Sequence, residues 1–400
     1  MENATHAGPL SGVRVVEFSI AMTGPFAAAV LADQGADVVK VERPGMGDIS
    51  RWVGAGVNGM TAVFLLCNRG KRSIAVDLAT PEGLDVARRL CAEADVIIQN
   101  FRTGVMDRLG LGYQDIAALN PEVIYTSLSG YGSTGPYAER SAYDTSIQAY
   151  AGIATSQADP EDGVPVFVRQ TIADKVTALF AAQAVSAALY ARDHGAGGQH
   201  LELSMMDAVV SFLWMDCAGN EVLMDSDRSS PSSIVGGFSP FRFLDGWGVV
   251  APTSDSDFAG MCRAFEVEGY EDPAVATMTA RRTNRGATEA MMDLCRAHAA
   301  NLTQVEATER LDDQRVPFSM VLSPEELIGD PHAVAVGLFE ERDHPVAGRV
   351  RIPRHPTRFS ATPAHPGGPT PSLGEQTNEL LEEIGLGEAA AGLRERGIVA

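Results

Sequence analysis

Short apolar runs alternate with longer segments of helical character through the first half of the chain. The runs typical of buried strands cover residues 13–18, 36–42, 73–78, 95–99, 123–128 and 201–203. The helical segments cover about 24–35, 80–93, 174–192 and 206–215. Thr80 and Pro81 mark one helix start, because Thr is a favoured N-cap and Pro is favoured at the first helical position. This alternation predicts an α/β fold with a parallel sheet and crossover helices.

The second half of the chain has a different pattern. Residues 225–237 are polar and rich in Ser, Gly and Pro, which is typical of a linker or an active-site loop. Residues 241–250 predict a β-hairpin that turns at Asp245 and Gly246, and helical segments follow to about residue 313. A proline-rich stretch then leads to a last helix over 377–384.

Composition places the chain among ordinary folded proteins, since 45% of its 400 residues are hydrophobic and 21% are charged. No apolar run approaches the roughly 18 residues needed to span a bilayer, and the N-terminus lacks the pattern of a signal peptide. We therefore expect a cytoplasmic protein. Five scattered cysteines without a CxxC pair and eight dispersed histidines predict neither a disulfide framework nor a metal site.

The net charge of −21 argues against nucleic acid or an anionic membrane as a partner, because both require a basic surface. An anionic ligand would need a local basic cluster. Basic residues do gather at strand ends and in the loops beside them, namely Lys40, Arg43, Arg69, Lys71, Arg72, Arg102 and Arg108. In open parallel sheets ligands bind beyond the carboxyl ends of the strands, so Arg43, Arg102 and Arg108 could converge on a ligand with several phosphates. The alternative is that these arginines pair with the abundant surface acids.

Standard nucleotide and hydrolase motifs are absent from the sequence. No GxGxxG follows the first strand, and no Walker A, HExxH or GxSxG sequence occurs. The sequence therefore gives little support to a nicotinamide-dependent enzyme or a P-loop enzyme as the class of this protein.

Asp174 is the candidate nucleophile, and it stands at the predicted start of the helix over 174–192. One interpretation is structural, because Asp is a preferred N-cap. The other is chemical, because a carboxylate at a helix N-terminus is favoured as the anion and can attack an activated acyl group. Lys175, one of three lysines in the chain, could balance negative charge nearby.

Several sequence blocks, in this order and spacing, identify a resemblance that covers nearly the whole chain. They are residues 35–44, 68–74, 77–83, 100–110, 129–136 and 371–377. The chain resembles the class III CoA-transferases, also called the CaiB/BaiF family, which includes formyl-CoA transferase. This resemblance implies that Asp174 is the nucleophile and that coenzyme A is a substrate, with no tightly bound cofactor. The positions it assigns to CoA binding are Met22, Thr23, Arg43, Val76, Asp77, Leu78, Asn100, Phe101, Arg102 and Arg108.

The resemblance also implies an architecture and an assembly. A large Rossmann-like domain, with a parallel sheet built from both chain ends, would comprise residues 1–220 and 326–400. A smaller inserted domain with its linkers would comprise residues 221–325. Two such chains would interlock like rings of a chain, which makes the enzyme an obligate homodimer with its site between subunits.

The implied reaction moves CoA from an acyl-CoA to a carboxylic acid through a mixed anhydride and an aspartyl-CoA thioester on Asp174. Three positions depart from formyl-CoA transferase. Met22 stands where that enzyme has a glutamine near the thioester, Ala79 replaces a basic residue, and the glycine loop is shortened to Gly236 and Gly237. The first departure casts doubt on oxalate or formate as substrates.

Two other functions remain open from the sequence. An α-methylacyl-CoA racemase of the same family would need a His-Asp couple, but Tyr143 stands at the histidine position before Asp144. Tyrosine, with an ordinary pKa of about 10, is a poor base at neutral pH. A non-catalytic CoA-binding paralogue would bind CoA without forming an adduct on Asp174. The sequence does not identify the acids, although Arg169 or Arg242 could hold a second carboxylate of a dicarboxylic acceptor.

Overall fold

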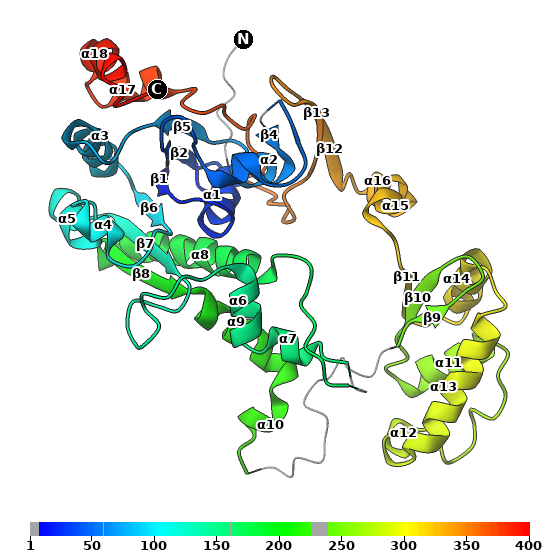
Figure 1. Ribbon diagram of the computed structural model, residues 1–400. Helices are drawn as coiled ribbons and strands as arrows, with labels where there is room; N and C mark the ends of the chain where they lie inside the picture. The colour runs from blue at the N-terminus through cyan, green and yellow to red at the C-terminus, as the bar shows by residue number, and fades with distance from the viewer. Residues whose placement is uncertain (1–7, 59, 160–161, 226–238) are drawn as a thin grey trace. The chain divides into compact units, whose positions relative to one another are not determined.

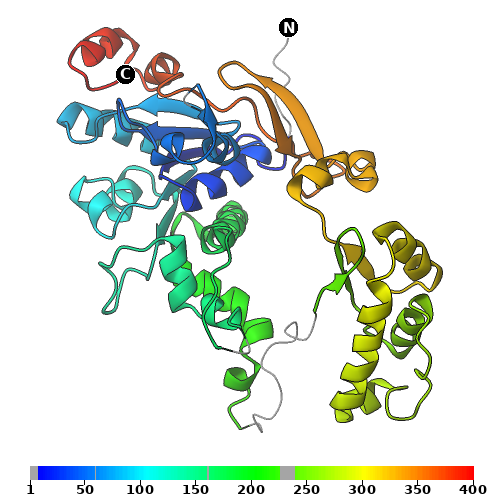
Figure 2. The ribbon, with the colours of Figure 1, turned by 45° about the vertical axis from the view of Figure 1, so that its right-hand side comes forward.

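The computed structural model describes residues 8–58, 60–159, 162–225 and 239–400. The chain divides into two compact units. The first comprises Met1–Ser232 together with Gly337–Ala400, and the second comprises Ser233–Val336. We call them the large unit and the small unit, and describe each by itself (Figures 1 and 2).

The large unit is built on a six-stranded parallel sheet of order β5-β2-β1-β6-β7-β8. Each strand lies within three residues of a predicted one. The strands are β1 Arg14–Phe18, β2 Asp37–Glu42, β5 Arg72–Ala75, β6 Val96–Gln99, β7 Ile124–Ser129 and β8 Gln199–Ser204. The order runs outward in both directions from β1 and β6, as in doubly wound nucleotide-binding folds. The α/β fold with a parallel sheet is therefore confirmed.

Helices cover both faces of this sheet. On one face, α1 (Thr23–Asp33) and α8 (Ile172–Ala191) pack their alanine-rich sides against the strand residues Val15, Val38 and Ile98. The opposite face is covered by α3 (Pro81–Ala92), α5 (Tyr113–Leu119), α17 (Thr377–Glu383) and α18 (Ala390–Glu395). Thr80 caps α3, as predicted, because its hydroxyl accepts a hydrogen bond from the Gly83 backbone at 3.1 Å.

All six strands of the sheet come from residues 14–204, which corrects the expectation that both chain ends build it. The C-terminal segment joins the large unit through α17, α18 and one antiparallel bridge between Val76 and Val399. The residues that begin this segment form a hairpin of β12 (Phe339–His344) and β13 (Gly348–Pro353), which the sequence pattern did not predict.

The remaining elements of the large unit are short, apart from α9. They are β3 Gly56–Val57, β4 Met60–Thr61, α2 Ala62–Asn68, α4 Val105–Arg108, α6 Asp144–Tyr150, α7 Ile153–Ser156, α9 Met205–Cys217 and α10 Gly219–Val222. Single-turn 3-10 or π segments cover Ile49–Trp52, Arg192–Ala196 and Gly387–Ala389.

The small unit has a three-stranded antiparallel sheet of β9 (Phe241–Arg242), β10 (Trp247–Val250) and β11 (Phe318–Met320). The first two strands form the predicted hairpin, whose turn is closed by a hydrogen bond from Phe243 N to Gly246 O at 2.9 Å. Its helices are α11 Asp255–Ala264, α12 Met278–Thr283, α13 Arg285–Ala299, α14 Gln304–Asp313, α15 Pro324–Gly329 and α16 Pro331–Ala335.

Helix α8 is long and apolar enough to cross a membrane by length and composition alone, which the expectation from sequence did not anticipate. About half of it is buried, and residues such as Ala181 and Val185 pack against the sheet in the interior of the large unit. These contacts are those of a core helix.

Candidate active site

The loop between β1 and α1 lies at the carboxyl edge of the sheet, at the point where the strand order reverses. Asn100, which follows β6, binds this loop twice: its Oδ1 accepts from Ile20 N at 3.0 Å, and its Nδ2 donates to Ile20 O at 2.9 Å. Ala21 N donates to Asp48 Oδ1 at 2.9 Å. Ala21 has a φ of 66°, a strained conformation for a residue with a Cβ, which these contacts maintain.

A buried network of charges supports the loop from below. Lys40 Nζ lies 2.9 Å from both Glu17 Oε1 and Asp48 Oδ2, and it donates to Ser19 O at 2.8 Å. Lys71 Nζ lies 2.5 Å from Glu17 Oε2. Burial opposes a charge on Glu17, but the two ammonium groups outweigh burial and lower its pKa. Burial of Lys71 lowers its pKa to about 8, against the opposing effect of Glu17.

The basic residues at strand ends therefore fall into two groups. Lys40 and Lys71 are fully buried, while Arg69 pairs with Asp33 at 2.6 Å and Arg72 pairs with Asp37 at 2.6 Å. None of these four cations is available to a ligand, because their partners are carboxylates of the large unit. Three arginines at the same edge are exposed, and no described residue forms a hydrogen bond or ion pair with their side chains: Arg43, Arg102 and Arg108.

Asp174 lies in the first turn of α8 and faces the start of α1. The Thr23 hydroxyl donates a hydrogen bond to Asp174 Oδ1, and the Asp174 backbone N donates to Asp144 Oδ2 at 3.1 Å. The N-cap interpretation is wrong, because the helix begins at Ile172 and its cap position is Thr171. Burial, reinforced by the charge of Asp144, raises the pKa of Asp174 to about 6, although the hydrogen bond from Thr23 opposes the rise.

Asp144 is a second carboxylate of this site that sequence reasoning did not select. It is 6% exposed at the start of α6, and Gln148 Nε2 donates to its Oδ1 at 2.5 Å. Gln148 also binds the backbone of residues 168–170, just before α8. Tyr143 beside it is 78% exposed. One sequence feature could have pointed to Asp144. It follows Tyr143 in the segment that matches the His-Asp couple of the racemases.

The residues expected to bind CoA differ in their surroundings. Met22 lies at the start of α1, where its sulfur accepts a hydrogen bond from Thr171 Oγ1 at 3.3 Å, beside Asp174. Val76 is 1% exposed and packs in the core, so its side chain is unavailable to a ligand. Asp77 and Leu78 are half-buried just beyond β5. Gly236 and Gly237 lie outside the described residues.

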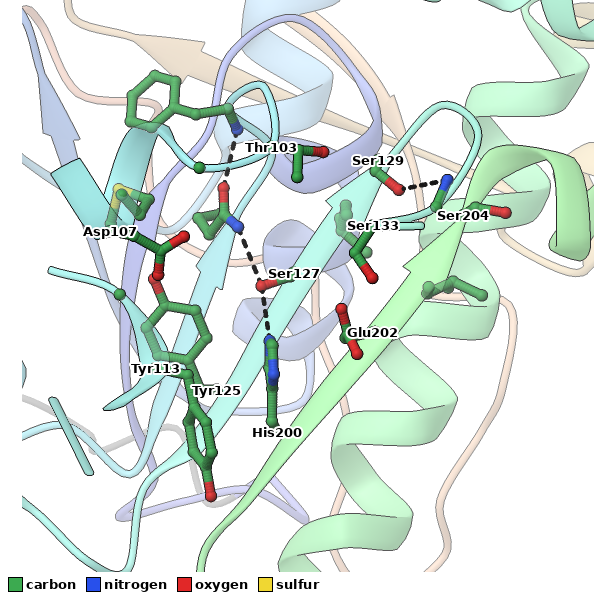
Figure 3. A pocket seen from close by; sticks show the side chains of 18 of the residues that line it. Thr103, Asp107, Tyr113, Tyr125, Ser127, Ser129, Ser133, His200, Glu202 and Ser204 are labelled. Atoms are coloured by element: carbon green, nitrogen blue, oxygen red, sulfur yellow. Dashed lines mark hydrogen bonds between the residues drawn. The ribbon is translucent and has the colours of Figure 1, made fainter. Parts of the chain in front are cut away.

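A cavity of about 400 Å³ opens beside Phe101 and Arg102, along β7 and β8 and at the carboxyl end of β6. Figure 3 shows a chain of hydrogen bonds along it. His200 Nε2 lies 2.8 Å from Ser127 Oγ, Gln99 Nε2 donates to Ser127 Oγ at 3.0 Å, and Gln99 Oε1 accepts from Phe101 N at 2.9 Å. Ser127 and His200 were not predicted as site residues from the sequence. Their chain holds the backbone of Phe101 and thereby the start of the loop that carries Arg102.

This geometry suits nucleophilic chemistry on a carbonyl group. A carboxylate whose pKa is about 6 is mostly ionised at neutral pH, and its oxygen lies near the first turns of two helices, α1 and α8. Helix N-termini present backbone N–H groups that stabilise developing negative charge. Among the described residues, no group of three or more His, Cys, Asp or Glu side chains is placed to hold a metal ion.

Comparison with known proteins identifies the family. The model for CoA-transferase family III matches residues 10–377. Succinate–glutarate CoA-transferase of Agrobacterium fabrum is 33% identical over 94% of this chain and 96% of its own, and mouse succinyl-CoA:glutarate CoA-transferase is 31% identical over 94% and 86%. The crystal structure of a CaiB/BaiF family protein from Brucella suis superposes with a TM-score of 0.81, at 32% identity and over 94% of this chain and 99% of that one.

The chain therefore belongs to CoA-transferase family III, which confirms the resemblance seen in its sequence. It is an enzyme that transfers CoA between an acyl-CoA and a carboxylic acid.

Proposed function

We propose that the enzyme transfers CoA through covalent intermediates on Asp174. The observation that carries this proposal is the position of the Asp174 carboxylate, which is half-buried, bound by Thr23 and at the strand-order reversal where doubly wound folds bind ligands. Its pKa of about 6 keeps it ionised, and burial limits the water that could hydrolyse an activated intermediate.

The reaction consists of four exchanges at carbonyl carbons. An Asp174 oxygen attacks the donor thioester and expels CoA thiolate, which leaves a mixed anhydride. The thiolate attacks the Asp174 carbonyl of this anhydride, releases the donor acid and forms an aspartyl-CoA thioester. The acceptor carboxylate then attacks that thioester and expels the thiolate. Finally the thiolate attacks the acceptor's carbonyl, which yields the new acyl-CoA and regenerates the Asp174 carboxylate.

Each step needs donors for an oxyanion, and α1 supplies candidates. The N-cap residue Met22 offers no side-chain cap, and no described residue accepts from the backbone N–H of Thr23 or Gly24. We assign these two amides to the oxyanion, since they point away from the helix body at its positive end. Pro25, with no N–H, removes the competing third donor.

The pH dependence of transfer should report Asp174. Since the carboxylate is the reactive form, kcat/KM is expected to fall as the pH drops through about 6. Replacing Asp144 by Asn removes a neighbouring negative charge, which lowers the pKa of Asp174 and moves this acid limb to lower pH. A kcat/KM profile between pH 4.5 and 8 measures the shift. Glu139→Gln, an exposed change of equal charge, should leave the limb in place, and an unmoved limb in Asp144→Asn would contradict the assignment.

We further propose that Arg43, Arg102 and Arg108 bind the phosphates of CoA, because they are exposed at the carboxyl edge without partners among the described residues. Arg108→Ala is expected to weaken CoA binding about 10- to 100-fold, which corresponds to about 1.5–3 kcal/mol for a charged hydrogen bond. Isothermal titration with CoA measures this change. Arg89→Ala removes an arginine on α3 that pairs with Asp85, and should leave CoA affinity unchanged. Equal losses in both variants would argue against a phosphate contact.

The substrate pair is proposed by likeness to the two glutarate enzymes, as succinyl-CoA or a similar donor with a dicarboxylic acceptor. Arg169 supports a dicarboxylic acceptor, because it is exposed on the segment that Gln148 holds next to α8. A panel of CoA thioesters against mono- and dicarboxylic acids, read by mass spectrometry, tests the proposal. Succinate and glutarate should exceed butyrate as acceptors. A preference for monocarboxylic acids would overturn the substrate class.

We also propose that the enzyme is a cytoplasmic homodimer of interlocked chains, with no tightly bound cofactor. Membership of family III supports this assembly. Cross-linking with a reagent that joins two copies, followed by mass determination under denaturing and native conditions, tests it. A monomer at micromolar concentration that retains full transfer activity would contradict it.

A further inference from the structure

The small unit contains a cavity of about 350 Å³ that has no part in the transfer chemistry proposed above. Its lining residues come mainly from β10 and the helices α11, α12 and α13. These elements all belong to the small unit (Figure 1). A volume of a few hundred Å³ is in the range of small-molecule sites.

The charge of this cavity is opposite to that of the protein. Three arginines line it, Arg281, Arg282 and Arg285, and no Asp or Glu among the described residues does, although the chain has 52 acidic residues and a net charge of −21. Arg281 is held in place by Asp255 at 2.7 Å and by the Val275 carbonyl at 2.9 Å. Its own charge is thus balanced within the unit.

The other two arginines are free for a ligand. Both Arg282 and Arg285 are exposed, and no described residue forms a hydrogen bond or ion pair with either guanidinium group. Arg282 lies in the last turn of α12, and Arg285 is the first residue of α13. Both therefore lie beside the short connection between the two helices, at the cavity. Paired guanidinium groups match the two oxygens of a carboxylate.

The rest of the lining is mixed: Ser239, Thr253 and Thr288 are polar, and the other side chains are apolar. Val250 and Phe258 are each 2% exposed, and Met278 and Met292 complete this side of the cavity. The Arg281 guanidinium lies over the Phe258 ring, 4.4 Å from its centroid. Methionine side chains adapt to flexible aliphatic ligands. A ligand that binds both the arginines and the apolar side chains has an anionic head and an apolar chain.

We propose that this cavity of the small unit is a binding site for a medium-chain aliphatic carboxylic acid. Its carboxylate pairs with Arg282 and Arg285, and its chain lies against Val250, Phe258 and the two methionines. An inorganic phosphate would leave the apolar wall in water, and CoA carries several charged groups for which the apolar side offers no partner.

Photolabelling of the full-length enzyme tests the proposal. The probe is an octanoate analogue carrying a diazirine on its chain, and labelled peptides are mapped by mass spectrometry. We expect label within residues 250–292, displaced by octanoate but not by equal concentrations of inorganic phosphate or CoA. Label confined to other peptides, or displacement by phosphate or CoA, would overturn it.

Matched variants provide a second measurement. The double change Arg282→Gln and Arg285→Gln should weaken octanoate binding, measured by isothermal titration, by about tenfold or more, since it removes both charged donors. Arg315→Gln changes an exposed arginine of the same unit outside the cavity and should leave binding unchanged. Equal affinity in the double variant and the wild type would contradict the site.

Discussion

Replacing Asp174 by Asn is expected to reduce kcat for CoA transfer by about 10⁴-fold or more, the size of loss seen when a covalent nucleophile is removed. The amide preserves the shape of the side chain and can still accept a hydrogen bond from Thr23. It cannot form an anhydride with a donor acyl group. CoA binding should change by less than about twofold, because the affinity comes from groups other than this carboxylate.

The control is Thr23→Val, which removes the hydroxyl but keeps the nucleophile. Loss of this hydrogen bond raises the pKa of Asp174, so the variant should retain transfer while its acid limb moves to higher pH. Transfer in Asp174→Asn above one hundredth of the wild-type rate, after deamidation is excluded by peptide mass, would remove the covalent mechanism.

Replacing Lys40 by Met is expected to lower the free energy of unfolding by about 3–5 kcal/mol, as when one member of a buried ion pair is removed. Its ammonium group lies between Glu17 and Asp48, and all three side chains are inaccessible to water. Methionine fits a similar volume but leaves negative charge buried with one cation fewer. The loop that carries Ala21 depends on Asp48, so transfer should fall as well.

Denaturant unfolding followed by circular dichroism measures the change in stability. Arg349→Met is the comparison, because Arg349 is 77% exposed and pairs with Glu341 at the surface. Surface pairs contribute about 1 kcal/mol or less. A loss in Lys40→Met no greater than that of Arg349→Met would show that the buried network contributes nothing special to the fold.

Most of the fold of the large unit could be predicted from the sequence, because its strands are short, mostly apolar runs that alternate with helices. The inner strands β1, β2 and β6 have two covered faces, so they read as nearly continuous hydrophobic sequence. The hairpin of β12 and β13 was not predicted, because its strands are rich in polar residues and lie largely outside the core. Five of the six residues of β12 are not buried. In β13 the alternation of Val350 and Ile352 with arginines extends over only four residues, which is at the lower limit for predicting a strand.

Part of the candidate site could be predicted from the sequence. Asp174 and Thr23 were selected by resemblance, and the structure places them in contact. The burial of Lys40 and Lys71 could not be predicted, because sequence position at a strand end does not say whether a cation points outward or into the protein. Asp144 was missed because its role depends on α6 and α8 meeting, and 30 residues separate it from Asp174. The Ser127–His200 contact likewise joins strands that are adjacent only in the sheet.

The central assertion is that one side chain carries first an acyl group and then CoA itself. Acid quench of the enzyme during turnover, followed by intact mass and peptide mapping, observes this directly. We predict a chain heavier by CoA less one water, mapped to Asp174 and converted by hydroxylamine to the aspartyl hydroxamate. Transfer at full rate with an unmodified chain at every time point, or with the adduct on another residue, would contradict the mechanism.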